Sequence, residues 1–127
     1  KTIHSRAILK SEVPLIKAVE QWGNLGAFVS ALYTNDYDLL SRSMKDRIIE
    51  PIRSILIPKF IQLQNAAIDS GALGCGISGS GPSIYTLSKG EIIAKNVGKS
   101  MSTIYDEIGL DYEVYYSKIN KEGIKIL

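Results

Sequence analysis

The residues best suited to chemistry form one glycine- and serine-rich stretch, Gly74-Cys75-Gly76-Ile77-Ser78-Gly79-Ser80-Gly81-Pro82-Ser83. Gly79 and Gly81 accept a positive φ and carry no Cβ, so the backbone there can approach another group closely. Free backbone amides, with the hydroxyls of Ser78, Ser80 and Ser83, suit an anion or a second glycine-rich loop that holds one. A tight connection in a small α+β domain would have the same composition, so the residues alone leave both interpretations open.

Two common nucleotide-binding motifs do not fit this stretch. It has no Gly-Lys-Ser or Gly-Lys-Thr ending of a Walker A loop. The pattern Gly-x-Gly-x-x-Gly occurs only at Gly74, Gly76 and Gly79, without a βαβ unit behind it. Any contact of this loop with phosphate must therefore belong to another class of site.

Arginine is the second residue type that suggests binding, because its planar guanidinium offers paired donors that match the two oxygens of a carboxylate. Arg6 precedes the first long helix that we expect, and Arg53 lies in an expected irregular segment after Pro51. Arginines in such places are usually solvated, so carboxylate binding is a hypothesis for both. A structural ion pair or a helix-end interaction explains Asp46 and Arg47 better.

The single histidine and the single cysteine indicate no metal site and no nucleophile. His4 has no Cys, Asp or Glu at ligand spacing, which favours a solvated or substrate-adjacent position. Cys75 lies in an expected buried strand without a histidine partner, and we interpret it as a packing residue. We assign no catalytic residue and no metal ligand.

Most of the chain around these residues has the three- and four-residue periodicity of apolar residues that predicts helices. We expect helices over about 14–33, from residue 37 to about 48, from near Pro58 to Gly71, and over 93–108, with a helix end and an irregular turn at 47–53. The first helix has an apolar stripe that comprises Leu15, Val19, Trp22, Gly26, Val29 and Tyr33. Gly23 and Gly26 either admit a closely packed backbone or merely weaken this helix.

Short runs of β-formers predict strands at 75–77 and 83–88, which form a hairpin around the glycine-rich turn, and further strands at 112–117 and 123–127. Long helices with short strands grouped around them indicate an α+β fold. We expect a helix layer packed on an antiparallel sheet of about four strands.

Composition places the chain among soluble globular domains. Its 127 residues are 45% hydrophobic and 22% charged, which is enough for one compact core. A net charge of +2 with interspersed signs gives no reason to expect nucleic acid or a membrane surface as a partner. One cysteine and no signal peptide favour the cytoplasm. Because the sequence does not begin with Met, we expect a piece of a longer chain.

The segment from Ala72 to Ser83 resembles the third, C-terminal motif of the GHMP kinases, which phosphorylate small metabolites with ATP. The resemblance narrows to the homoserine kinases through other segments in the same order. These are Arg6-Ala7-Ile8-Leu9, Asn35-Asp36-Tyr37-Asp38-Leu39-Leu40, the segment from Met44 to Arg53, and Leu56-Ile57-Pro58. The part that discriminates among GHMP kinases is Asp-Arg-Ile-x-Glu-Pro-x-Arg, at 46–53.

This resemblance implies that residues 1–127 are the C-terminal domain, with a ferredoxin-like fold, and that the N-terminal ATP-binding half is absent. The intact enzyme would transfer the γ-phosphate of ATP, with Mg²⁺, to the hydroxyl of L-homoserine on the route to threonine. The resemblance further implies a homodimer, an inactive isolated fragment and no cofactor bound to it.

By the same resemblance, Thr2, Arg6 and Arg53 would bind the substrate. The glycine-rich residues Ser78, Gly79, Ser80 and Gly81 would support the phosphate region. Two alternatives remain open at this point: the C-terminal domain of another GHMP kinase with a different acceptor pocket, and a stand-alone module that senses an amino acid.

Overall fold

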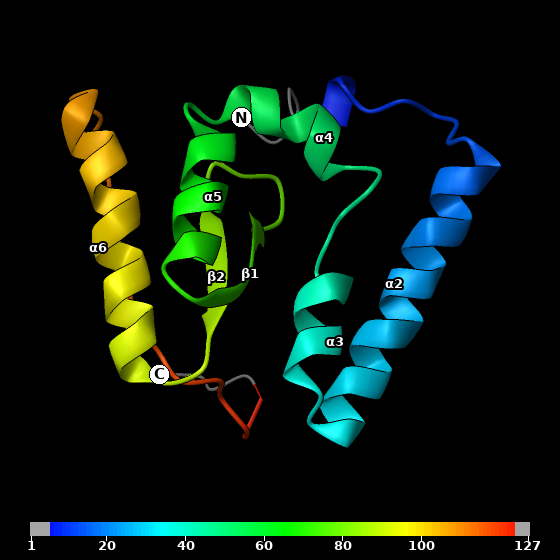
Figure 1. Cartoon of the computed structure of the whole chain (residues 1–127). Helices are drawn as coiled ribbons and strands as arrows, with labels where there is room; N and C mark the ends of the chain where they lie inside the picture. Colours follow the sequence, from blue (N-terminus) through cyan, green and yellow to red (C-terminus); the bar gives the residue numbers. More distant parts are fainter. Residues whose placement is uncertain (1–5, 124–127) are drawn as a thin grey trace.

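The structure is a computed structural model, and it describes residues 6–123. Two of the residues considered above, Thr2 and His4, lie outside this range. The elements follow the order α2 (Leu15–Thr34), α3 (Tyr37–Ser43), α4 (Glu50–Arg53), the 3-10 turn η1 (Ser54–Leu56), α5 (Phe60–Asp69), β1 (Ala72–Ile77), β2 (Ile84–Ser88) and α6 (Glu91–Glu107). Figure 1 shows α5 and α6 beside the hairpin and α2 with α3 on the other side. The α+β class is confirmed.

Helix α2 begins and ends, and helix α3 begins, where the sequence signals predict. Helix α2 starts directly after Pro14 and ends where Asn35 takes the left-handed conformation, with a φ of 54°. The Asp36 side chain then accepts a hydrogen bond from the Leu39 amide at 2.9 Å, which caps the N-terminus of α3. This tight turn folds α3 back against α2.

The hydrophobic core lies between the hairpin and the last two helices. Strands β1 and β2 are antiparallel, with Cys75 opposite Thr86 and Ile77 opposite Ile84. Cys75 packs with Ala67 of α5 and Val97 of α6 in the main buried cluster. The predicted hairpin is therefore confirmed, and its strands hold the two ends of the glycine-rich loop side by side.

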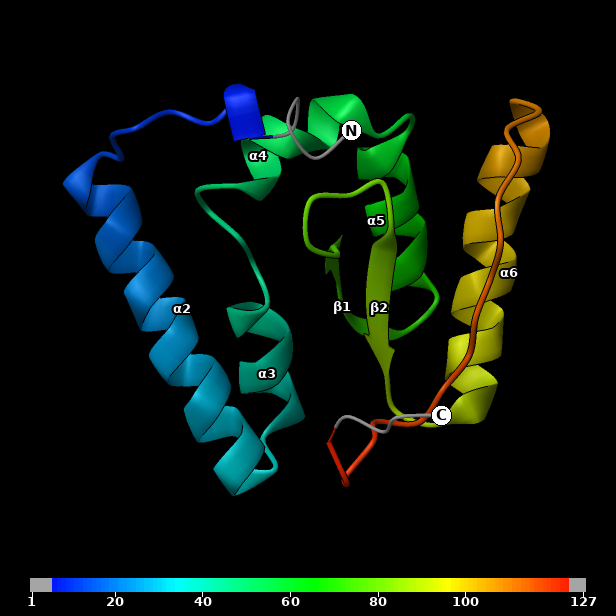
Figure 2. The same ribbon diagram turned by 180° about the vertical axis from the view of Figure 1, so that it is seen from behind.

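The expected sheet of about four strands was wrong: within residues 6–123 the sheet has two strands. Residues 112–117 form no strand, and this part of the chain runs along α6 (Figure 2). The Tyr116 ring contacts Gly98 of α6, and the Tyr112 hydroxyl donates a hydrogen bond to Asp106 at 2.8 Å. The aromatic pattern predicted a strand, whose backbone would pair with the edge of the sheet. Instead, the side chains of Tyr112 and Tyr116 contact α6. Of the expected strand 123–127, residues 124–127 lie outside the described range.

The expected helix boundary near residue 48 was also wrong, because α3 ends at Ser43. The irregular turn expected around Pro51 is the short helix α4, with Pro51 in its first turn. Hydrogen bonds from polar side chains to the backbone of 45–50, described below, replace the helical hydrogen bonds that periodicity predicted. Arg53 consequently lies on a helix and not in an irregular segment.

The α2 glycines do not serve close backbone packing among the described residues. A Cβ built on Gly23 or Gly26 meets nothing within 4 Å in this part of the chain. The close-packing explanation thus finds no support among residues 6–123. No helix within residues 6–123 combines the length and the apolar character needed to cross a membrane.

Candidate functional site

The candidate site is built around α4, and Asp46 determines where this short helix begins. Its carboxylate accepts hydrogen bonds from the amides of Ile48 and Ile49, each at 2.8 Å, and of Glu50, at 3.1 Å. These amides would otherwise lack partners at the helix start. The helix-end interpretation of Asp46 is confirmed, and the cap fixes the direction in which α4 presents Arg53.

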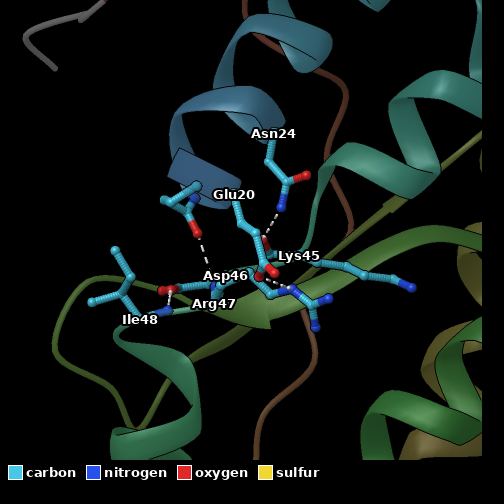
Figure 3. A network of polar contacts seen from close by, with 7 residues as sticks. Glu20, Asn24, Lys45, Asp46, Arg47 and Ile48 are labelled. Carbon is cyan, nitrogen blue, oxygen red and sulfur yellow. Dashed lines mark hydrogen bonds and ion pairs between the residues drawn. The ribbon is translucent and has the colours of Figure 1, made fainter. Parts of the chain in front are cut away.

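The segment before α4 is tied to α2, as Figure 3 shows. The Asn24 side chain donates to the Lys45 carbonyl at 2.9 Å. The Arg47 amide donates to the Gln21 side chain at 2.8 Å, and the Arg47 guanidinium pairs with Glu20 at 3.4 Å. The ion-pair interpretation of Arg47 is also confirmed. Three α2 side chains thus hold the loop from which α4 starts.

Arg53 joins α4 to the glycine-rich loop. Its Nη1 donates a hydrogen bond to the Gly79 carbonyl oxygen at 2.9 Å, across 26 positions of sequence. The two residues lie in the lining of a small pocket of about 90 Å³, together with Met44, Asp46, Ile49, Glu50, Ile77 and Tyr85. The structure therefore places a guanidinium, two carboxylates and a phenol around one small volume.

The glycine-rich loop is closed by its own backbone. The Ser78 amide donates to the Ser83 carbonyl at 2.8 Å, and the Gly81 amide donates to the Ser78 carbonyl at 3.0 Å. Gly79 and Gly81 have φ values of 59° and 72°, in the left-handed region that favours glycine. Ser78 and Gly79 are exposed, while Ser80 and Gly81 are half-buried. The loop is thus a preformed tight turn with an accessible tip.

Glu50 links α4 to the core side of the pocket. The Gln64 amide group donates to the Glu50 carboxylate at 2.9 Å and to the Cys75 carbonyl at 3.1 Å. Burial, with a smaller contribution from the nearby charge of Asp46, raises the pKa of Glu50 above its usual value. Burial also raises the pKa of the Tyr85 hydroxyl, and the Glu50 charge adds to that effect. A half-buried carboxylate and a phenol therefore lie close to the base of the loop.

Of the site residues expected from sequence, the structure brings Arg53 and the glycine-rich loop together. Arg6 lies on a short helical turn at 6–7 that Figures 1 and 2 both place beside α4. Its side chain is exposed and does not line the pocket. Cys75 is 3% exposed, and burial raises the pKa of its thiol to about 12, as expected for a packing residue.

Sequence reasoning missed the pocket-lining Glu50 and Tyr85, and also Gln64, which donates a hydrogen bond to Glu50 without lining the pocket itself. Glu50 belongs to the Asp-Arg-Ile-x-Glu-Pro-x-Arg segment that carried the family resemblance, so this membership could have marked it as a site residue. Tyr85 gave no such signal, because a tyrosine in a strand is a common packing residue. Gln64 stands on an otherwise ordinary amphipathic helix. Only the tertiary contacts relate these residues to the pocket.

This arrangement can attract and orient a small anionic group at Arg53, next to a loop with exposed backbone. It is a poor place for a divalent cation, because three backbone amides already occupy the Asp46 carboxylate. No group of three His, Cys, Asp or Glu residues within 6–123 is placed to hold a metal ion. The residues described here thus do not fit a magnesium site, and we derive no step through one.

Comparison with known proteins adds a family and several relatives. The family model described as GHMP kinases C terminal matches residues 28–107. The protein named homoserine kinase of Chlorobium phaeobacteroides is 43% identical over 129 residues, which span 100% of this chain and 40% of that protein. That of Chloroherpeton thalassium is 42% identical, over 99% of this chain and 40% of its own length.

A solved structure gives the same result. The crystal structure of homoserine kinase from Cytophaga hutchinsonii superposes with a TM-score of 0.92 and 47% identity, over 95% of this chain and 38% of that one. The chain spans about two fifths of the length of the curated relatives it matches.

Proposed function

The chain belongs to the GHMP kinase family, and on this basis we propose that it is the C-terminal, substrate-side domain of a homoserine kinase. In the whole protein, the L-homoserine hydroxyl oxygen forms a bond to the γ-phosphorus of ATP while the bond to the β,γ-bridging oxygen breaks. The hydroxyl proton is released to solvent, and ADP leaves with the electron pair of the broken bond. Similarity over the whole chain to proteins named homoserine kinase supports this choice of acceptor.

The observation that carries the proposal is the placement of Arg53 at Gly79. A guanidinium held there puts a permanent positive charge beside the pocket, where it attracts the carboxylate of an amino acid. Because the amino acid is held by its carboxylate, its side-chain hydroxyl is free to extend toward the glycine-rich loop. Positioning of this kind is the main contribution that a protein makes to phosphoryl transfer.

Two further residues belong to the proposal as substrate ligands, Thr2 and Arg6. Ser78, Gly79, Ser80 and Gly81 would support the phosphate region from the substrate side, since Gly79 and Ser78 are exposed at the loop tip. ATP and its magnesium ion are assigned to the N-terminal domain of the full-length protein. This chain would contribute orientation of the acceptor, and we expect it to be inactive alone.

The test is ATP consumption by the full-length product of the parent gene with homoserine, mevalonate, galactose or shikimate as acceptor. The 127-residue chain is assayed alongside. Turnover with homoserine by the full-length protein, and none by the shorter chain, is the expected result. Preference for another acceptor would reject the homoserine assignment, and no turnover with any acceptor would reject the kinase proposal.

A further inference from the structure

Helix α2 exposes the most apolar side of its surface. Leu15, Val19, Trp22, Val29 and Tyr33 recur at steps of three, four and seven residues, so they share one side of the helix, which we call the α2 outer face. All five side chains are exposed, Trp22 by 63% and Tyr33 by 87%. The apolar stripe that the sequence predicts is therefore present but uncovered in this part of the protein.

The side of α2 that contacts the rest of the chain is a different one. Ala31 is the buried residue of this helix, and Gln21 and Asn24 bind the backbone before α4. The two charged residues of α2 are Lys17 and Glu20, and neither belongs to the outer face. Figures 1 and 2 show α3 between α2 and the hairpin, with α2 outermost. The helix thus packs through Ala31, polar side chains and the half-buried Phe28, and leaves its other large apolar residues exposed.

Such a surface is unusual for a face that stays in water. Contiguous apolar patches on soluble proteins mark contact sites, because covering them releases water from apolar surface. A single exposed leucine would need no explanation, but five large apolar side chains on one uncharged helix face do. A partner surface should therefore cover this face in the complete protein.

We propose that the α2 outer face is the docking surface for the polypeptide that precedes residue 1 in the full-length protein. The proposal rests on the assignment of this chain to the C-terminal part of a longer kinase. The relatives are about two and a half times as long as the segment they share with this chain, and the matching family model describes a C-terminal region. A large preceding part is thus the available partner.

Covalent linkage favours this occupant over a second copy of the chain. Helix α2 and the preceding polypeptide belong to one covalent chain, so contact between them is intramolecular. A covalent tether raises the effective concentration of the two surfaces, whereas a second copy must pay the full cost of association. The absence of charge on the α2 outer face also fits an apolar contact between domains of one chain.

Photo-crosslinking in the full-length protein identifies what covers the face. Trp22 is replaced by p-benzoylphenylalanine, and after irradiation the crosslinked peptides are sequenced by mass spectrometry. We expect an intramolecular crosslink, at monomer mass on a denaturing gel, to a peptide that precedes residue 1. Crosslinks to residues 1–127 of a second molecule, or no crosslink at all, would overturn the proposal.

Thiol labelling measures the same coverage without a crosslinker. In the full-length protein, Val29→Cys on the outer face should react more slowly than Lys17→Cys, on another side of the same helix, by on the order of tenfold or more. Equal rates would show an open face and reject the proposal. Both readouts use neither ATP nor homoserine, so a different acceptor would reject the proposed substrate and leave this inference standing.

Discussion

Arg53 on α4 donates a hydrogen bond from Nη1 to the Gly79 carbonyl oxygen at 2.9 Å, and so connects the short helix to the tip of the glycine-rich loop. The contact is polar on both sides and lies at the edge of a small pocket. It makes the position of a positive charge depend on the conformation of the loop.

Arg53→Ala in the full-length protein should raise the KM for homoserine far more than the KM for ATP. A hydrogen bond to a charged group contributes about 1.5–3 kcal/mol, which corresponds to an increase of roughly 10- to 150-fold. Steady-state kinetics with each substrate varied in turn gives the two constants. Arg42→Ala is the matched control, since it removes an exposed arginine of α3 that does not line the pocket. Equal effects of Arg53→Ala on both constants would contradict the assignment.

Asp46→Ala should destabilise the start of α4 and weaken homoserine binding through the displaced Arg53. Three amides lose their acceptor, and the loss of an N-terminal cap costs about 0.5–2 kcal/mol. Asp46→Asn keeps one carbonyl acceptor and should recover part of both effects. Urea unfolding followed by circular dichroism, together with the KM for homoserine, checks this prediction. If the variant is destabilised but its KM for homoserine is unchanged, the Asp46 cap does not contribute to substrate binding, and this prediction is wrong.

Glu50→Gln should change how stability depends on pH. The pKa of Glu50 is raised from its usual 4.5, mainly by burial, so the folded state binds this proton more tightly than the unfolded state. The contribution of Glu50 to stability is therefore fully present below pH 4.5 and is lost as pH rises through the folded pKa. Glu50→Gln has no carboxyl group to ionise at this position, so its stability does not fall in this way as pH rises.

Urea midpoints of the 127-residue chain and of Glu50→Gln, measured from pH 4 to pH 7, test that sign. The difference should move in favour of the variant as pH rises, by less than about 1.4 kcal/mol per pH unit, the limit for one proton. Glu12→Gln, at an exposed position before α2, controls for the removal of a surface carboxylate. A difference that moves the other way would mean that the ionised carboxylate is stabilised in place.

Gly98→Ala should destabilise the chain, although alanine is the better helix former. A Cβ at this position would overlap the phenol ring of Tyr116, which lies against α6. Overpacking of this kind typically costs about 1–3 kcal/mol. In the Tyr116→Ala background the clash is gone, and Gly98→Ala should then stabilise by up to about 1 kcal/mol. Denaturant unfolding of the four combinations gives both values, and additive effects would show that the two residues do not meet.

Local sequence signals determined most of the elements. Pro14 and Asn35 bound α2, Gly71 follows α5, and the two β-rich runs around the glycine-rich turn form the predicted hairpin. Each of these outcomes depends on backbone preferences of a few neighbouring residues. The segments 72–83 and 46–53 also carried the resemblance to a family, and that resemblance implied that Arg53 binds the substrate and that the loop supports the phosphate region.

Tertiary structure decided what these signals leave open. Residues 112–117 have the pattern of a strand, but a strand needs an edge, and Tyr116 packs on Gly98 instead. The helical period continues to residue 48, yet Asp46 and two α2 side chains take over the backbone amides and carbonyls of 45–50. The α2 stripe was readable as apolar, while the partner that would cover it was not. Long-range contacts between polar and aromatic side chains decided these points, because they depend on which surfaces meet and not on local propensity.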